Sequence, residues 1–124
     1  MLPARAPKKH KRATRWKSQS HRRFVTKDFA CANCGTVELV REPAHVRIGS
    51  GAGMGEKPDD WRCVPLCGGP EGCHARQHRI GERTFWAEYE KRQGQSVEQL
   101  IKSLIAVSPK RHEIEAIQKE RGNG

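Results

Sequence analysis

The sequence predicts a small α+β domain that is stabilised by bound zinc, with a basic arm before it and helices after it. Its 124 residues are enough for one domain but not for two. Hydrophobic residues make up 35% of the chain and aromatic residues only 6%, so the core needs another stabilising element. Short β-prone segments between residues 37 and 66 come before helical patterns that begin at residue 73.

Most of the net charge of +10 lies at the N-terminus. Residues 1–28 carry ten Lys and Arg residues and one acid, whereas residues 29–124 carry fourteen Lys and Arg residues and thirteen acids. We expect residues 1–17 to form a mobile basic arm that binds DNA, because cations that neutralise phosphates release counterions. The alternative is that the arm only makes the protein more soluble. Trp16, within this arm, either stacks on a base or packs on the domain. The cations of the arm are Arg5, Lys8, Lys9, Lys11, Arg12, Arg15 and Lys17.

The sequence contains no apolar run that could span a membrane, and its basic N-terminus lacks the apolar segment of a secretory signal. We therefore expect a cytoplasmic protein. In that compartment five cysteines are expected to be metal ligands or thiols rather than disulfides.

The first half of the domain is predicted to hold one helix and several short strands. Residues 18–28 have the pattern of a helix, with Ser18 or Ser20 as its N-cap. A glycine-rich loop over residues 49–60 precedes the last strand. Residues 29–35 are expected to be a strand that turns at the CxxC pair. The other β-prone segments are residues 37–40, 44–48 and 61–66, with Pro43 separating the first two of these.

The second half of the chain is predicted to be helical. Gly81 should end the first of these helices, and Ser96 with Gln99 forms a capping box at the start of the third. We place the folded domain at residues 18–93 and a helical extension at residues 94–124, because Gly94 breaks the pattern. The predicted helices are residues 73–79, 82–93 and 96–106, and a last one that starts at Ser108–Pro109.

The cysteines predict a structural zinc site. Cys31 and Cys34 can bind one tetrahedral ion, and Gly35 lets the backbone turn beneath their sulfurs. A second pair, separated by a lengthened turn, completes the set. Cys63 is an alternative ligand, because it lies four residues before Cys67 and faces the same side of a strand. The predicted zinc ligands are Cys31, Cys34, Cys67 and Cys73.

Three histidines predict a second metal centre. His74 and His78 lie four residues apart on one helix and can hold a divalent cation together. His45 lies on a strand that is expected to face them in a ββα unit. A neutral imidazole there could take a proton from water while the cation stabilises charge on a phosphodiester. The alternatives for His45 are a structural histidine or a zinc ligand in place of one cysteine.

These motifs, taken in order, resemble the HNH (ββα-metal) endonuclease superfamily. The motifs are CANC at residues 31–34, AHVR at 44–47, GMGEKPDDWRCVPLC at 53–67 and CHARQH at 73–78. The resemblance covers about residues 24–90 and is greatest to the phage and prophage branch that includes recombination-enhancement nucleases.

The resemblance implies a small zinc-stabilised ββα-metal (HNH) module that cuts DNA. It implies that His45 is the general base and that His74 and His78 bind a catalytic Mg²⁺, Mn²⁺ or Zn²⁺ ion. It makes Asp60 a candidate ligand or orienting group, and a recombinase filament a candidate partner. Arg47 and Lys57, which lie within these motifs, are further expected DNA contacts.

One departure from the superfamily supports a different function. Many members carry an Asp or His metal ligand immediately before the general base, where this chain has Ala44. A non-catalytic zinc-containing module that binds DNA through its arm is therefore the alternative to an enzyme. A zinc-stabilised adaptor that recruits another protein through its C-terminal helices is a third reading.

Overall fold

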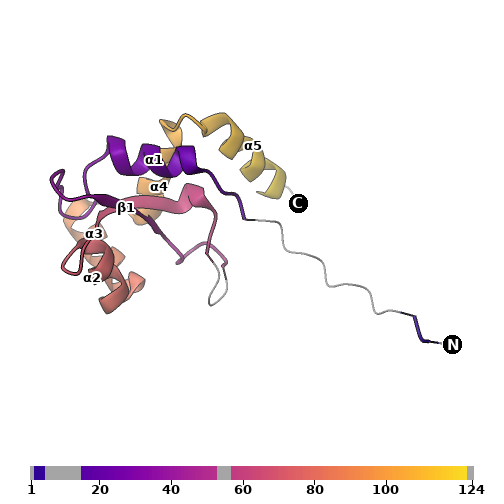
Figure 1. Ribbon diagram of the computed structural model, residues 1–124, viewed down its shortest axis with the longest axis horizontal. Coiled ribbons are helices and arrows are strands. Elements are labelled where there is room, and N and C mark those ends of the chain that lie inside the picture. Colours follow the sequence, from indigo (N-terminus) through magenta and orange to yellow (C-terminus); the bar gives the residue numbers. More distant parts are fainter. Residues whose placement is uncertain (1, 5–14, 53–56, 123–124) are drawn as a thin grey trace.

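The computed structural model describes residues 2–4, 15–52 and 57–122 and has an α+β fold. Figure 1 shows α1 along one face of a two-stranded antiparallel sheet and α2 and α3 on the other side. No helix within these ranges is long and apolar enough to cross a bilayer. The elements are α1 (Gln19–Asp28), β1 (Arg41–His45), the 3₁₀ helix η1 (Asp60–Arg62), β2 (Cys63–Cys67), α2 (Cys73–Ile80), α3 (Glu82–Gln93), α4 (Val97–Ala106) and α5 (Arg111–Gly122).

The sheet accommodates a proline at the same position in both of its strands. Pro43 of β1 lies opposite Pro65 of β2. The carbonyl of Pro65 accepts from Ala32 N over 2.8 Å, so the backbone groups of this pair point away from the ladder. Proline is tolerated there because its missing N–H is not needed for strand pairing. The prediction that Pro43 separates two strands was therefore wrong.

Two other predicted strands are replaced by irregular structure. Residues 29–35 have the turn predicted at the CxxC pair but no strand, and residues 37–40 form a loop. Arg41 fixes that loop, because its guanidinium donates to the carbonyls of Val37 and Leu39 over 2.8 and 2.9 Å. The predicted strand at 61–66 begins instead at Cys63, after the turn of η1.

The helix boundaries follow the predicted caps closely. Ser18 caps α1 by accepting from His21 N, and both hydrogen bonds of the Ser96–Gln99 capping box are present at α4. Gly81 ends α2 with a positive φ of 89°. Only the last helix differs, since Ser108 Oγ accepts from Lys110 N and α5 begins at Arg111.

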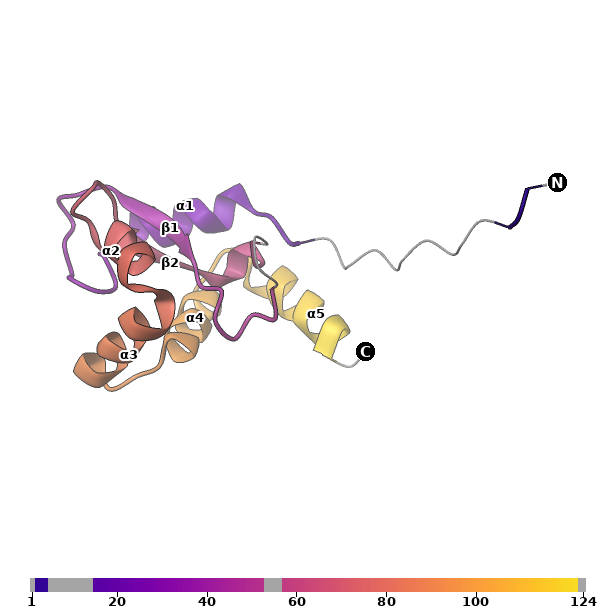
Figure 2. The same cartoon turned by 90° about the horizontal axis from the view of Figure 1, so that it is seen from below.

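The core lies between the sheet and the C-terminal helices. Figure 2 shows α4 between α3 and α5. Side chains of β2, α3, α4 and α5 form one buried cluster, so the segment after residue 94 shares a core with the rest of the chain. Members of this cluster are Val64, Leu66, Phe85, Trp86, Tyr89, Ile101, Leu104, Ile105 and Ile114.

The folded part of the chain begins before α1. Trp16 is 8% exposed, and its ring centroid lies 5.6 Å from that of Trp61. Its indole Nε1 donates to Glu113 Oε1 of α5 over 3.0 Å, and its carbonyl accepts from Asp60 N over 2.9 Å. Of the two roles considered for Trp16, the structure has packing on the domain.

His21 links α1 to the turn before α5. It is fully buried, and its Nδ1 lies 2.7 Å from Ser108 Oγ. Among the described residues its Nε2 has no hydrogen-bond partner. Burial lowers the pKa of His21 from 6.5 to about 4, although the charge of Asp60 opposes this shift. The imidazole is therefore neutral in the folded protein near pH 7.

Acid should destabilise the fold through His21. The pKa of His21 is about 4 in the folded protein and 6.5 for the unperturbed side chain, so stability is full above pH 6.5 and falls as the pH drops toward 4. Between pH 7 and pH 4, the free energy of unfolding should fall by about 3 kcal/mol less in His21→Gln than in the wild type. Denaturant unfolding from pH 7 to pH 4 measures it, with the exposed His112→Gln as control. Equal pH slopes for wild type and His21→Gln would contradict this assignment.

Candidate active site

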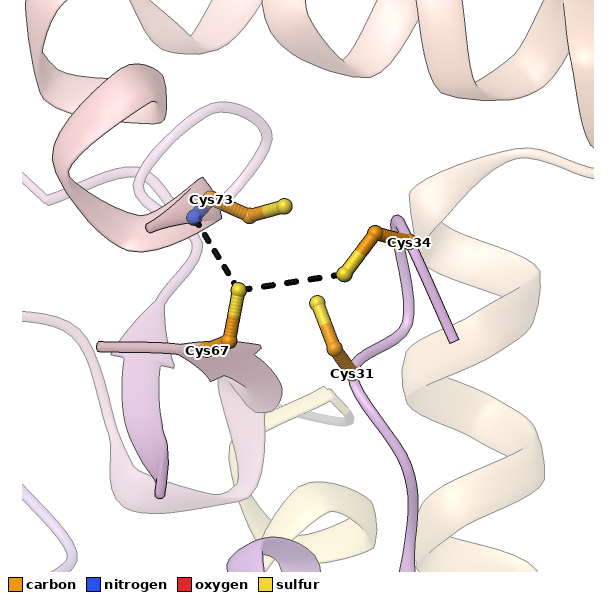
Figure 3. Close-up of side chains that lie close together, drawn as sticks. All are labelled: Cys31, Cys34, Cys67 and Cys73. Carbon is orange, nitrogen blue, oxygen red and sulfur yellow. Dashed lines mark hydrogen bonds between the residues drawn. The ribbon is translucent and has the colours of Figure 1, made fainter. Parts of the chain in front are cut away.

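Four cysteines from three segments of the chain form one cluster (Figure 3). Their Sγ atoms all lie within 4.8 Å of one another. Cys31 and Cys34 lie in the turn after α1, Cys67 ends β2, and Cys73 begins α2. The structure brings together the residues predicted to bind the structural zinc.

The chemistry and spacing of this cluster fit a metal ion such as zinc. Cys34 Sγ lies 3.8 Å from Cys67 Sγ. A tetrahedral site with Zn–S bonds of about 2.3 Å has edges of about 3.8 Å. Burial raises the pKa of the Cys67 thiol, and the hydrogen bond that Cys73 N donates to Cys67 Sγ over 3.2 Å offsets part of this rise. Burial alone would raise the pKa of Cys31, but hydrogen bonds from backbone N–H groups, first that of Cys34, lower it to about 7.

Two glycines allow the turns that hold these cysteines. Gly35 adopts a φ of 77°, in the left-handed region, and its N–H donates to the Cys31 carbonyl over 2.9 Å. Gly72 precedes Cys73, and a Cβ at this position would lie 2.2 Å from the Gly68 carbonyl oxygen. The lengthened second turn therefore folds tightly enough to bring Cys67 and Cys73 together.

The fifth cysteine lies apart from the cluster. Cys63 and Cys67 face the same side of β2, as alternation requires, but they lie at opposite ends of the strand. Cys63 is buried beside His45 and Asp60. Burial raises the pKa of the Cys63 thiol well above its usual range. The alternative in which Cys63 replaces Cys67 as a zinc ligand is therefore wrong for this structure.

His45 is paired with a buried carboxylate. Its Nε2 lies 2.9 Å from Asp60 Oδ1, and Asp60 is fully buried. The same oxygen accepts from Arg15 Nη1 over 2.9 Å, while Oδ2 accepts from Ser18 N over 2.8 Å and lies 3.4 Å from Arg22 Nη1. Asp60 thus connects η1 to β1 and to the start of α1.

This pairing sets the protonation of His45. Burial alone would raise the pKa of Asp60, but hydrogen bonds from His45 and Ser18 N and the charge of Arg22 outweigh it and lower that pKa. An ionised carboxylate only accepts, so His45 Nε2 carries the hydrogen and Nδ1 keeps a lone pair. Burial lowers the pKa of His45, with partial compensation from Asp60. The side chain is therefore neutral near pH 7 and able to accept a proton.

His74 and His78 present converging nitrogens on α2. Their Nε2 atoms lie 3.3 Å apart, and their ring centroids lie 4.9 Å apart. Two ligands of a tetrahedral ion with metal–nitrogen bonds of about 2.0–2.1 Å are separated by about 3.3–3.4 Å. The pair has the spacing expected of two imidazoles on one divalent cation.

All three histidines line a single cavity of about 480 Å³. The cavity lies at the outer edge of β1. His45 is on the side of the sheet that α1 covers. His74 and His78 belong to α2, on the other side of the sheet. Three cationic side chains complete a basic lining. The cavity is lined by Arg22, Pro43, His45, Arg47, Lys57, Pro58, His74 and His78.

Asp60 is not beside the histidine pair of α2. Within the described ranges, its ligand atoms group with those of His45 and Cys63 rather than with those of His74 and His78. Its oxygens are occupied by donors from β1 and from the start of α1, on the opposite side of the sheet. Of the two roles considered for Asp60, its geometry matches an orienting group for His45.

The predicted DNA contacts are divided among several locations. Arg47 and Lys57 line the cavity, and Lys17 is exposed. Arg15 donates to Asp60 Oδ1 and, over 3.4 Å, to the Pro58 carbonyl, so it belongs to the folded site rather than to a mobile arm. The remaining cations of the arm lie outside the described residues. They are Arg5, Lys8, Lys9, Lys11 and Arg12.

Three residues of this region were not predicted from the sequence. Arg22 of α1 lines the cavity, and Glu42 Oε1 lies 2.9 Å from His74 Nδ1. Asn33 donates to Cys73 Sγ over 3.3 Å and accepts from Arg92 of α3. No motif indicates Arg22 or Asn33. Strand alternation could have placed Glu42 on the same face as Ala44, but not beside His74.

A sequence profile described as a protein of unknown function (DUF968) matches residues 3–108. No curated protein and no solved structure matches the chain.

Removing one clustered cysteine should release bound metal and destabilise the fold. We expect the purified protein to hold one zinc ion per cysteine cluster and Cys31→Ser to lose it, at a cost on the order of 10 kcal/mol. The measurements are zinc content by atomic emission and Tm with and without a chelator. Cys63→Ala is the matched control, because it removes a buried cysteine outside the cluster. Full zinc retention by Cys31→Ser would contradict the ligand set.

Proposed function

This chain belongs to the DUF968 family of proteins of unknown function, and we propose that it is a metal-dependent endonuclease that hydrolyses phosphodiester bonds of DNA. One observation carries the proposal. A histidine held by a buried carboxylate and a convergent histidine pair line the same cavity, together with three cations. A base, a cation site and positive charge around one cavity are what hydrolysis of a phosphate diester requires.

His45 serves as the general base in this proposal. Asp60 accepts from Nε2–H and so holds the tautomer in which Nδ1 can take a proton from an attacking water. Because burial lowers the pKa of His45, the base form is populated at neutral pH. Arg15 and Arg22 keep Asp60 ionised, which preserves this tautomer.

His74 and His78 are the residues that would hold the divalent cation. A bound cation would stabilise negative charge on the phosphate and on the leaving oxygen. The guanidinium groups of Arg22 and Arg47 and the ammonium group of Lys57 attract a phosphate into the same cavity. The HNH-like order of the motifs along the chain supports the same assignment.

DNA is favoured as the substrate by the basic segment that precedes the site. Arg15 and His45 both contact Asp60 Oδ1, and the sequence before Arg15 carries five further Lys and Arg residues. Cations in this position can hold a nucleic-acid backbone while the cavity acts on one phosphate.

A non-catalytic DNA-binding zinc module is the second candidate. Ala44 alternates with His45 and lies on the same face of β1 as Glu42, which contacts His74. The methyl group of Ala44 is fully buried and offers no metal ligand there. His74 and His78 form no three-ligand group with another described His, Cys, Asp or Glu residue. Cleavage assays separate the two candidates.

Plasmid nicking with added Mg²⁺ or Mn²⁺ tests the enzymatic proposal. We expect the wild type to nick supercoiled DNA and His45→Ala to lose at least about 10²-fold of the rate, because the general base is removed. Asp60→Asn should also be slow, since its amide does not favour the reactive tautomer. His112→Ala, an exposed substitution on α5, is the control. DNA binding without nicking by the wild type would instead support the second candidate.

The arm should supply salt-dependent affinity for DNA. Deleting residues 2–14 removes five cations and leaves Arg15 and Trp16 in place. We expect weaker binding to every duplex sequence and a slope of log K against log salt that is smaller in magnitude by up to about 4.5. Fluorescence anisotropy at several salt concentrations measures both quantities. An unchanged slope would show that the arm makes no phosphate contacts.

A further inference from the structure

Glu42 of β1 contacts one of the two convergent histidines. Glu42 Oε1 lies 2.9 Å from His74 Nδ1, while His74 Nε2 faces His78 Nε2 at 3.3 Å. The two nitrogens of His74 therefore face different partners, a carboxylate on the strand and an imidazole one helical turn away.

The carboxylate determines which nitrogen of His74 carries the hydrogen. An ionised carboxylate has no hydrogen to donate, so His74 Nδ1 must be the donor of this bond. His74 Nε2 then keeps its lone pair toward His78. A histidine that donates its other N–H to a carboxylate is fixed in ring orientation and is a more basic metal ligand.

The backbone beside Glu42 provides the space for this contact. A Cβ at Gly68 would lie 2.8 Å from Glu42 Cδ and 3.0 Å from Oε1. No positive φ is recorded at Gly68, so an alanine there can keep the same backbone. The absence of a side chain at position 68 therefore leaves room for the carboxylate next to His74.

From these contacts we propose that Glu42 is a positioning residue that holds His74 in the Nδ1–H tautomer and prepares His74 and His78 to bind a divalent cation. The proposal rests on the role of this pair as metal ligands in the proposed function, but it does not require that DNA be cut. Through Glu42, β1 would support the cation site even though Ala44 of the same strand offers no metal ligand.

The tautomer of His74 gives the first test. Long-range ¹H–¹⁵N NMR of the zinc-loaded full chain reports which imidazole nitrogen carries the hydrogen. We expect Nδ1–H for His74 in the wild type and a gain of Nε2–H in Glu42→Ala. Glu42→Gln keeps an accepting oxygen and should retain Nδ1–H. An unchanged tautomer in Glu42→Ala would overturn the proposal.

Binding of Mn²⁺ gives the second test, because this ion competes poorly with zinc for thiolates and leaves zinc on the cysteines. Titration followed by electron paramagnetic resonance should show a 10–100-fold weaker affinity in Glu42→Ala, with partial rescue in Glu42→Gln. Gly68→Ala keeps the carboxylate but displaces it and should behave like Glu42→Ala. His78→Ala should lose the site altogether.

Glu88→Ala is the matched control for both measurements. The Glu88 side chain is 47% exposed, close to the 48% of Glu42, and it also contacts α2, but through Arg76. Wild-type Mn²⁺ affinity in Glu42→Ala would overturn the positioning role and leave the endonuclease proposal intact. Failure of the wild type to bind Mn²⁺ would overturn the cation site itself and, with it, both proposals. If the wild type does not nick DNA while the Mn²⁺ affinities and the His74 tautomers of the variants are as expected, only the endonuclease proposal is overturned.

Discussion

The cluster of four cysteines is the constraint on which the rest of the structure depends. It joins the turn after α1 to the end of β2 and to the first residue of α2. Cys73 and His74 are consecutive, so whatever fixes Cys73 also fixes the position at which the histidine pair begins. A metal bound by these four thiolates would add to the core and hold the short helix α2 in register with the sheet.

A second, independent connection fixes the other side of the cavity. Asp60 is fully buried, yet both of its oxygens have donors, from His45, Arg15 and the backbone of Ser18. Burying a carboxylate is costly unless it is compensated in this way. The compensation ties the segment before α1, the 3₁₀ turn η1 and β1 to one point, and it leaves His45 oriented at the edge of the sheet.

The position of the cavity follows from these two connections. The free edge of β1 separates the face covered by α1 from the face next to α2, and the cavity is lined by side chains from both faces. His45 comes from one face, and Glu42 reaches His74 on the other, because neighbouring strand residues alternate. The basic side chains around this edge are Arg22 of α1, Arg47 after β1 and Lys57 before η1, which are distant in sequence.

Local patterns in the sequence determined the parts of this protein that depend on neighbouring residues. Cap residues located the starts of α1 and α4, and cysteine spacing identified the four residues of the cysteine cluster, because both are set by chemistry within a few positions. The tertiary structure alone decided the pairing of Pro43 with Pro65, the packing of Trp16, and the partners of His45 and His74. Those contacts depend on strand register and on how elements pack across the sheet. A one-residue change of register would move Glu42 to the other face, and no local pattern specifies that register.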